Sequence, residues 1–220
     1  MALFSIVAQR TLSDIRDSKK YIIRKMADGN CWMSDNLKLD LVADTAVDVA
    51  PFSGADTISW TPNSDTTSSS GNAYNVAINA NYKANVNGGN WYYPWYAATA
   101  GQGTNTASPT INRSICPKGW RLPDGDTSNK SFYNLITTAY SLPSSEAGIA
   151  SLKAVPLSFV AAGAYSSGVL LSSSYGYYWS ATPKTSNANN AYHSYFNTSG
   201  INLEGNSSKS SGFSVRCVSI

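Results

Sequence analysis

Residues 177–180 read Tyr-Tyr-Trp-Ser and residues 213–218 read Phe-Ser-Val-Arg-Cys-Val. Each run follows a glycine and is rich in aromatic or β-branched residues, which is typical of β-strands. In the second run the apolar residues alternate with Ser214 and Arg216, as expected of a half-buried strand. Further strands at 157–160 and 191–196 complete a predicted antiparallel meander in the C-terminal half.

The N-terminal half predicts less regular structure. Residues 19–39 fit a hairpin, because the β-branched run 21–26 precedes turn residues at 27–30. The segment 1–19 is either a first strand or the remnant of a leader. Residues 42–90 are rich in Asp, Ser, Thr, Asn and Gly, and we expect there a loop-rich insertion with at most a brief helix.

Helical periodicity is confined to the middle of the chain. Apolar residues at i, i+3, i+4 and i+7 predict a helix over residues 131–142, with Ser128 or Asn129 as its cap. A second short helix is expected over 145–152, closed by Pro156. These elements predict an α+β fold.

The composition limits the kinds of partner. Charged residues make up 13% of the chain and the net charge is +3, without any run of Lys or Arg longer than two. We therefore expect no nucleic-acid partner, and no apolar stretch approaches the length of a membrane span. With 14 tyrosines and 6 tryptophans among abundant Ser and Asn, the surface resembles that of an antibody paratope.

Signals of catalysis and of metal binding are weak. His193 is the only histidine, and no Gly-x-Ser-x-Gly elbow or phosphate-binding glycine loop occurs. We therefore expect neither an enzyme nor a cofactor. Calcium is the alternative at Asp124 and Asp126, where the Asp-Gly sequence also suits a turn, which is the interpretation we favour.

The cysteines leave two interpretations open. Cys31, Cys116 and Cys217 are far apart and form no Cys-x-x-Cys pair, so a zinc site is not expected. Either one pair forms a disulfide and leaves one thiol, or all three are small buried residues.

An aromatic cluster, Trp-Tyr-Tyr-Pro-Trp-Tyr, occupies residues 91–96. It is either a stacking platform for sugars or bases, or a plug in the hydrophobic core. We favour the core, because aromatic side chains contribute to stability chiefly through buried area.

Four segments together resemble a known family: DGNCWMSDNL (28–37), SICPKGWRLP (114–123), GYYWSAT (176–182) and GFSVRCV (212–218). Their order is similar to that of the Fibrobacter succinogenes major paralogous domain family, over residues 20–220. That family is similar to the C-type lectin fold. The resemblance implies a single C-type lectin-like domain of the α+β class, with antiparallel sheets, one or two helices and long irregular loops.

The same segments contain residues that suit a scaffold. Arg121 and Arg216 offer planar guanidinium groups that tie loop carbonyls or carboxylates such as Asp35. Three tryptophans are expected to be buried anchors with fixed partners for their indole N–H groups: Trp32, Trp120 and Trp179.

Residues 185–212 differ in composition, since fifteen of the twenty-eight are Asn, Ser or Tyr. Alternation predicts that Tyr192, Ser194 and Phe196 anchor a strand, while the residues between them face outward. The predicted ligand-contacting residues are Tyr175, Tyr177, Asn187, Asn189, His193, Tyr195, Asn197, Asn202 and Asn206.

This pattern resembles the variable proteins of diversity-generating retroelements, in which adenines of a C-terminal repeat are mutated. Asparagine codons then scatter into residues such as Asn, Ser, Tyr and His. The resemblance implies a non-catalytic display protein at an extracellular or cell-surface location, in which residues 175–212 bind a protein or glycan ligand.

Three other interpretations stay open. The 175–212 surface is a solvated loop surface without diversification, or the chain is a fixed carbohydrate-binding lectin that uses residues 91–96 and calcium. The calcium–sugar signatures Glu-Pro-Asn and Trp-Asn-Asp are absent from the sequence, which disfavours the lectin. An enzyme of the formylglycine-generating branch ranks last, because the cysteines fall in scaffold segments.

Overall fold

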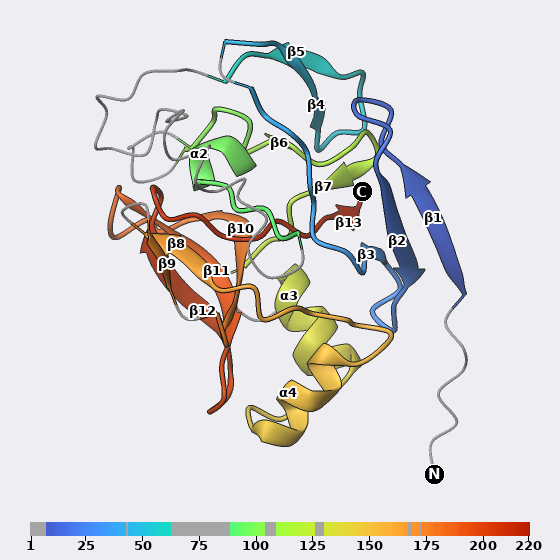
Figure 1. Cartoon of the computed structure of the whole chain (residues 1–220), viewed down its shortest axis with the longest axis vertical. Coiled ribbons are helices and arrows are strands. Elements are labelled where there is room, and N and C mark those ends of the chain that lie inside the picture. The colour runs from blue at the N-terminus through green and yellow to red at the C-terminus, as the bar shows by residue number, and fades with distance from the viewer. Residues whose placement is uncertain are drawn as a thin grey trace.

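Most elements of the computed structural model are antiparallel strands, and its helices are short, so the fold class is α+β as predicted (Figure 1). No helix in the described part of the chain is long and apolar enough to span a membrane. The structure describes residues 8–42, 44–62, 89–103, 109–125, 130–166, 169–171 and 173–220.

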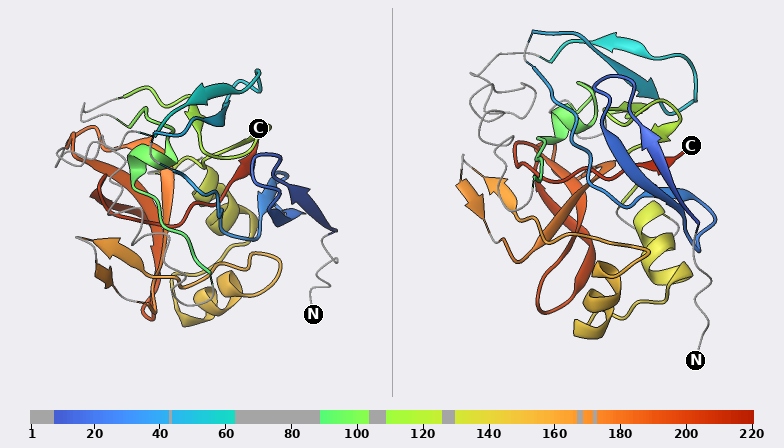
Figure 2. Two further views of the ribbon diagram at one scale, coloured as in Figure 1. Left: turned by 45° about the horizontal axis from the view of Figure 1, so that its top comes forward. Right: turned by 45° about the vertical axis from the view of Figure 1, so that its right-hand side comes forward.

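A five-stranded sheet contains strands from both the N-terminal and the C-terminal part of the chain. Its order is β1 (Gln9–Ser13), β2 (Lys20–Lys25), β3 (Cys31–Met33), β13 (Val218–Ser219) and β7 (Trp120–Arg121). The predicted hairpin over 19–39 is confirmed as β2 and β3, which are antiparallel. Figure 1 and the left view of Figure 2 show β1 at the outer edge of the molecule, whereas β13 and β7 lie further inside it.

The loop prediction for residues 42–90 was wrong in its first part. Strands β4 (Val47–Pro51) and β5 (Ile58–Trp60) form a hairpin, and β4 also pairs with β6 (Arg113–Ser114). Burial explains why this segment forms strands, since Val49 and Trp60 belong to the core and are 0% and 8% exposed. Residues 63–88 lie outside the described chain.

The two predicted helices are present with different bounds. The first comprises α3 (Ser131–Tyr133) and the π-helical η1 (Asn134–Ala139), and the second is α4 (Glu146–Lys153). The proposed caps, Ser128 and Asn129, lie outside the described residues. A further short helix, α2 (Trp95–Ala98), was not predicted.

The C-terminal meander is the three-stranded sheet of β10 (Gly176–Pro183), β11 (Asn190–Phe196) and β12 (Ile201–Ser208). A separate hairpin, β8 (Ala164–Ser166) and β9 (Val169–Leu171), precedes it.

Two predicted strands are not formed as expected. Residues 157–160 are not a strand, because the carbonyls of Leu157 and Ser158 accept hydrogen bonds from the Arg216 guanidinium at 2.7 and 3.0 Å. Residues 213–217 make only isolated bridges, and Ser214 and Arg216 are as buried as the apolar residues between them. The C-terminal segment is therefore enclosed on both sides rather than half-buried.

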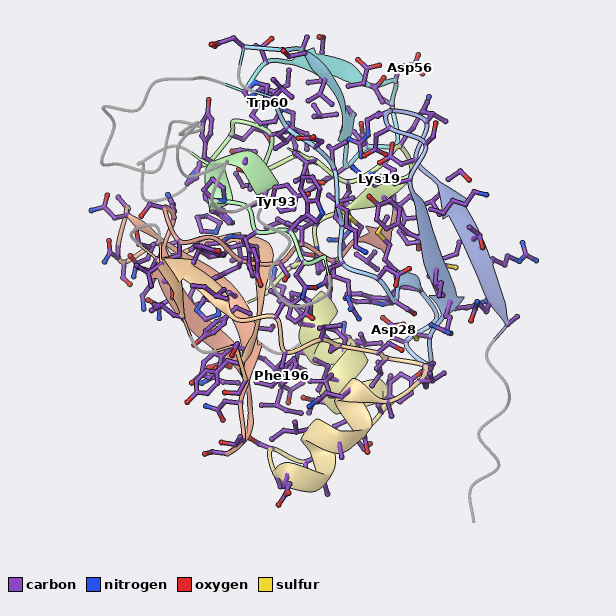
Figure 3. The ribbon with its side chains drawn as sticks, viewed as in Figure 1. Lys19, Asp28, Asp56, Trp60, Tyr93 and Phe196 are labelled. Atoms are coloured by element: carbon purple, nitrogen blue, oxygen red, sulfur yellow. A yellow bond between two sulfur atoms is a disulfide. The ribbon has the colours of Figure 1, made fainter. Side chains whose placement is uncertain are left out.

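Two hydrophobic cores lie on opposite sides of the β10–β12 sheet. The first contains Trp179 and Phe213, and the second contains Tyr178 and Phe196 together with residues of α3, η1 and α4. In Figure 3, Phe196 lies between the sheet and the helices, whereas Tyr93, a member of the first core, lies near the middle of the molecule.

The three tryptophans predicted as anchors are buried. The indole N–H groups of Trp32 and Trp179 donate to Asp28 and to the Tyr93 carbonyl, at 2.9 and 2.7 Å, and Trp120 is 7% exposed. In the 91–96 cluster, Tyr92, Tyr93 and Trp95 are buried, as the core interpretation predicts.

The C-terminal segment is fixed by two long-range links. Cys116 and Cys217 form a disulfide across 101 residues, and Cys31 is free. Arg216 bonds the 157–158 carbonyls and Asn36, and its guanidinium lies 4.2 Å from the Phe159 ring centroid. Asp35, the predicted carboxylate partner, instead accepts a hydrogen bond from the Ile22 amide at 2.6 Å.

Candidate functional site

The register of the β10–β12 sheet decides which predicted contact residues meet. Tyr177 lies opposite Tyr195, Trp179 lies opposite His193, and Tyr195 pairs on its other side with Asn202. Directly opposed residues of antiparallel strands carry their side chains on the same face. These five side chains therefore share one face of the sheet.

Three tyrosines and an asparagine on this face remain accessible, and we call Tyr175, Tyr177, Tyr195 and Asn202 the tyrosine patch. The ring centroids are 6.0 Å apart for Tyr175–Tyr177 and 5.7 Å apart for Tyr177–Tyr195, with interplanar angles of 29° and 26°. All three rings are half-buried and Asn202 is exposed. The patch is a row of near-parallel phenols whose free edges reach the surface.

A buried aromatic floor supports this row. Tyr177 stacks on Phe213 at 4.9 Å and 20°, and Phe213 also contacts Trp179 and His193 at 4.3 and 4.8 Å between centroids. The Trp179 and Phe213 rings are 0% and 3% exposed. Because protein cores are close-packed and hold their rotamers, the floor fixes the positions of the tyrosines above it.

His193 was predicted to face outward, and this prediction was wrong. It does share the face of Tyr195, but it is 2% exposed beneath Phe213 and the tyrosines. The reason lies in Gly205, which sits opposite it: a Cβ added there would lie 2.6 Å from His193 Cε1 and 2.8 Å from Tyr195 Cδ1. The missing side chain lets both rings lie against β12.

Burial determines the chemistry of His193. Desolvation lowers the pKa of the imidazole from its ordinary 6.5 to about 4, so the ring is neutral at physiological pH. Its Nε2 lies 3.0 Å from Ser207 Oγ. The pair resembles a nucleophile and its base, but no carboxylate within the described residues bonds to the ring, and a pKa near 4 makes it a poor base.

Two predicted asparagines lie in the β10–β11 turn, toward the other end of the sheet from Tyr195. Asn187 and Asn189 are exposed, and the Asn187 carboxamide accepts a hydrogen bond from the Asn189 amide at 3.0 Å. These side chains shape the turn, and the structure does not bring them into the patch.

Hydrogen bonds also hold the other predicted asparagines. Asn197 accepts from the amides of Ser199 and Gly200 in the β11–β12 turn, at 2.8 and 3.1 Å. Asn202 accepts from the Glu204 amide at 2.8 Å, which leaves its NH₂ group to point elsewhere. Asn206 pairs with Tyr192 on the opposite face and accepts from Asn190 at 3.0 Å.

The patch itself is uncharged. Burial raises the pKa of the Tyr177 hydroxyl, and the neighbouring Tyr175 and Tyr195 hydroxyls raise it further. A phenol hydroxyl can both donate and accept hydrogen bonds. An uncharged surface of this kind suits neutral ligands.

The calcium alternative finds no support at Asp124. Its carboxylate accepts from Arg121 at 2.9 Å and from Ser131 at 3.3 Å, which fixes the turn before α3. Asp126 lies outside the described residues. No group of three or more His, Cys, Asp or Glu side chains in the described chain could hold a metal ion.

Sequence reasoning predicted that Trp179 is a buried anchor, but not that Trp179 and Phe213 together support the tyrosines, and Gly205 was not considered at all. A glycine opposite a strand aromatic is a signal for close approach of a ring to the backbone, and it could have indicated that His193 is buried.

Comparison with known proteins gives one match. Residues 151–218 are similar to a family described as "Domain of unknown function (DUF8237)". That span contains β8 to β12 and all the residues of the tyrosine patch. No curated protein and no solved structure matches the chain.

Proposed function

We propose that this chain is a non-catalytic ligand-binding protein that displays the tyrosine patch on a C-type lectin-like scaffold. The observation that carries the proposal is that four predicted contact residues, Tyr175, Tyr177, Tyr195 and Asn202, share one accessible face on a buried aromatic floor. Tyrosine provides contact area at low entropic cost, and carboxamides adapt their hydrogen bonds. Rigid support limits the entropy lost on binding.

The ligand is a neutral protein or glycan surface rather than a nucleic acid. Phosphate backbones require clustered Lys or Arg, whereas the patch contains only phenols and a carboxamide. A display role places the protein at a cell surface or in the extracellular space. The resemblance to retroelement targets adds that residues 175–212 are diversified.

Binding is tested with two probes, a phage-displayed library of random peptides and an array of neutral glycans. We expect the wild-type protein to bind members of one probe, and Tyr177→Ala combined with Tyr195→Ala to weaken that binding at least tenfold. Ile15→Ala, at a side chain 92% exposed far from the patch, is the matched control. Binding that is equally strong in the wild type and in the tyrosine double variant would contradict the proposal.

Diversification is tested separately in the DNA that flanks the coding sequence. We expect a near-identical repeat whose adenines correspond to the differences within residues 175–212, and a reverse-transcriptase gene nearby. Finding neither would limit the proposal to a fixed binding site, of which a carbohydrate-binding lectin is the alternative form.

A further inference from the structure

The β8–β9 hairpin exposes apolar side chains beside the tyrosine patch. Val169 is 59% exposed and Leu171 is 45% exposed, whereas Leu170 between them packs against the small core of Tyr92, Ala162 and Tyr165. A strand normally turns its apolar side chains inward and its polar ones outward. In β9 the side chains on both faces of the strand are apolar.

The hairpin is continuous with the face that carries the patch. Ala164, directly opposite Leu171, is buried in the same core as Phe213, against which Tyr177 packs. The chain before β8 bridges to the start of β10, since the Gly163 amide bonds to the Tyr175 carbonyl at 2.6 Å. The orange hairpin lies beside the β10–β12 sheet in Figures 1 and 2.

Two other edge strands, β12 and β1, are protected in ways that β9 is not. β12 carries Glu204 and a bulge between Asn202 and Gly205, and β1 carries Arg10. Charges and bulges of this kind prevent unwanted association at sheet edges. The sequence between Lys153 and Lys184, which contains β8, β9 and β10, has no Asp, Glu, Lys or Arg.

We infer that the ligand surface extends from the tyrosine patch onto Val169 and Leu171, and that its occupant is an uncharged, apolar polypeptide segment of a protein partner. This inference rests on the proposed function of the patch. Branched aliphatic side chains gain free energy only when the partner also buries apolar surface, which hydroxyl-rich sugars do little to provide. Exposed apolar residues beside aromatic anchors are typical of protein–protein contacts.

Lysine substitutions at the hairpin test the inference. Peptides selected from the phage library are synthesised, and their affinity is measured by titration calorimetry for the wild type, for Val169→Lys/Leu171→Lys and for Tyr177→Ala/Tyr195→Ala. We expect both double variants to bind at least tenfold more weakly. Ile15→Lys is the matched control, and thermal unfolding verifies that each variant is folded.

Four outcomes separate the inference from the function on which it rests. Loss of peptide binding in both double variants, with the control unchanged, supports both. Peptides that depend on the tyrosines but not on Val169 and Leu171 overturn the inference alone. Binding of glycans only, through the tyrosines, also overturns the inference alone. No binding to either probe, or binding indifferent to the tyrosines, overturns both.

Discussion

The two faces of the β10–β12 sheet are built from similar residues and have opposite relations to the rest of the molecule. Tyr178, Ser194 and Phe196 face the helices and are at most 4% exposed. On the other face, Tyr177 and Tyr195 rest on buried rings and reach the surface. The residue type of an aromatic side chain therefore does not show its role. The layer that packs against its face of the sheet determines whether the side chain is buried or accessible.

Adjacent residues of β11 make this comparison sharp, because Phe196 and Tyr195 point to opposite faces. Phe196→Ala should remove about 3–5 kcal/mol of unfolding free energy, since a buried aromatic loses its transfer energy and leaves a cavity. Urea denaturation followed by tryptophan fluorescence measures it. A loss below about 1 kcal/mol would mean that the helical face is not closed.

Acid should lower the stability of the folded protein through His193, which is buried on the patch face. Its folded pKa, about 4, lies below the ordinary 6.5, so between these values the unfolded chain binds the proton and the folded protein does not. Stability is therefore lost as the pH falls below 6.5, and the loss is complete below about pH 4. Its size is about 3 kcal/mol, at 1.36 kcal/mol per pKa unit.

The His193→Phe variant isolates this contribution from that of the carboxylates. Its unfolding free energy should fall less between pH 7 and pH 4 than that of the wild type, by about 3 kcal/mol. Equal losses in the two proteins would contradict the burial of His193.

Gly205→Ala should have a smaller effect, of about 1–2 kcal/mol, because overpacking forces neighbouring rings to move. The added Cβ would press on His193 and Tyr195, so affinity for a patch ligand should fall together with stability. Gly29→Ala, where nothing lies within 4 Å of the new Cβ, is the control for crowding, although its φ of 86° adds backbone strain. An unchanged ligand affinity in Gly205→Ala would contradict the expectation that the added Cβ displaces the rings of His193 and Tyr195.

Tyr195→Ala should have the smallest effect on stability, about 1 kcal/mol or less, because the ring is half-buried. Its effect on ligand binding should be the larger one, at least tenfold. Paired with Phe196→Ala, it gives opposite results at neighbouring positions, and similar stability losses would remove the distinction between the two faces.

Local pattern predicted the existence of the β2–β3 hairpin, of α4 and of strands β10 and β11. The failures concern which faces are covered: Arg216 was expected on the outer face of a half-buried strand, yet it is 0% exposed, while its bonds to the 157–158 carbonyls are of the kind predicted. Alternation cannot reveal a second layer that covers the polar face.

The candidate site was predicted in its aromatic part and less so in its asparagines. Tyr175, Tyr177 and Tyr195 meet because their register follows from the strands. Asn187 and Asn197 bind amides of their own turns, and short-range hydrogen bonds of this kind are favoured wherever Asn lies in a turn. His193 was misplaced because its burial depends on Gly205 and Phe213, which are distant in sequence.

The most direct test of the central claim is to map a selected ligand on the protein by NMR. A ¹⁵N-labelled sample is titrated with the peptide or glycan that the wild type binds. We expect amide shift changes at Tyr175, Tyr177, Tyr195 and Asn202, and little change at Tyr178 or Phe196. Changes centred instead on the pocket of about 510 Å³ that includes Ile149 and Thr198, with a silent tyrosine patch, would contradict the account.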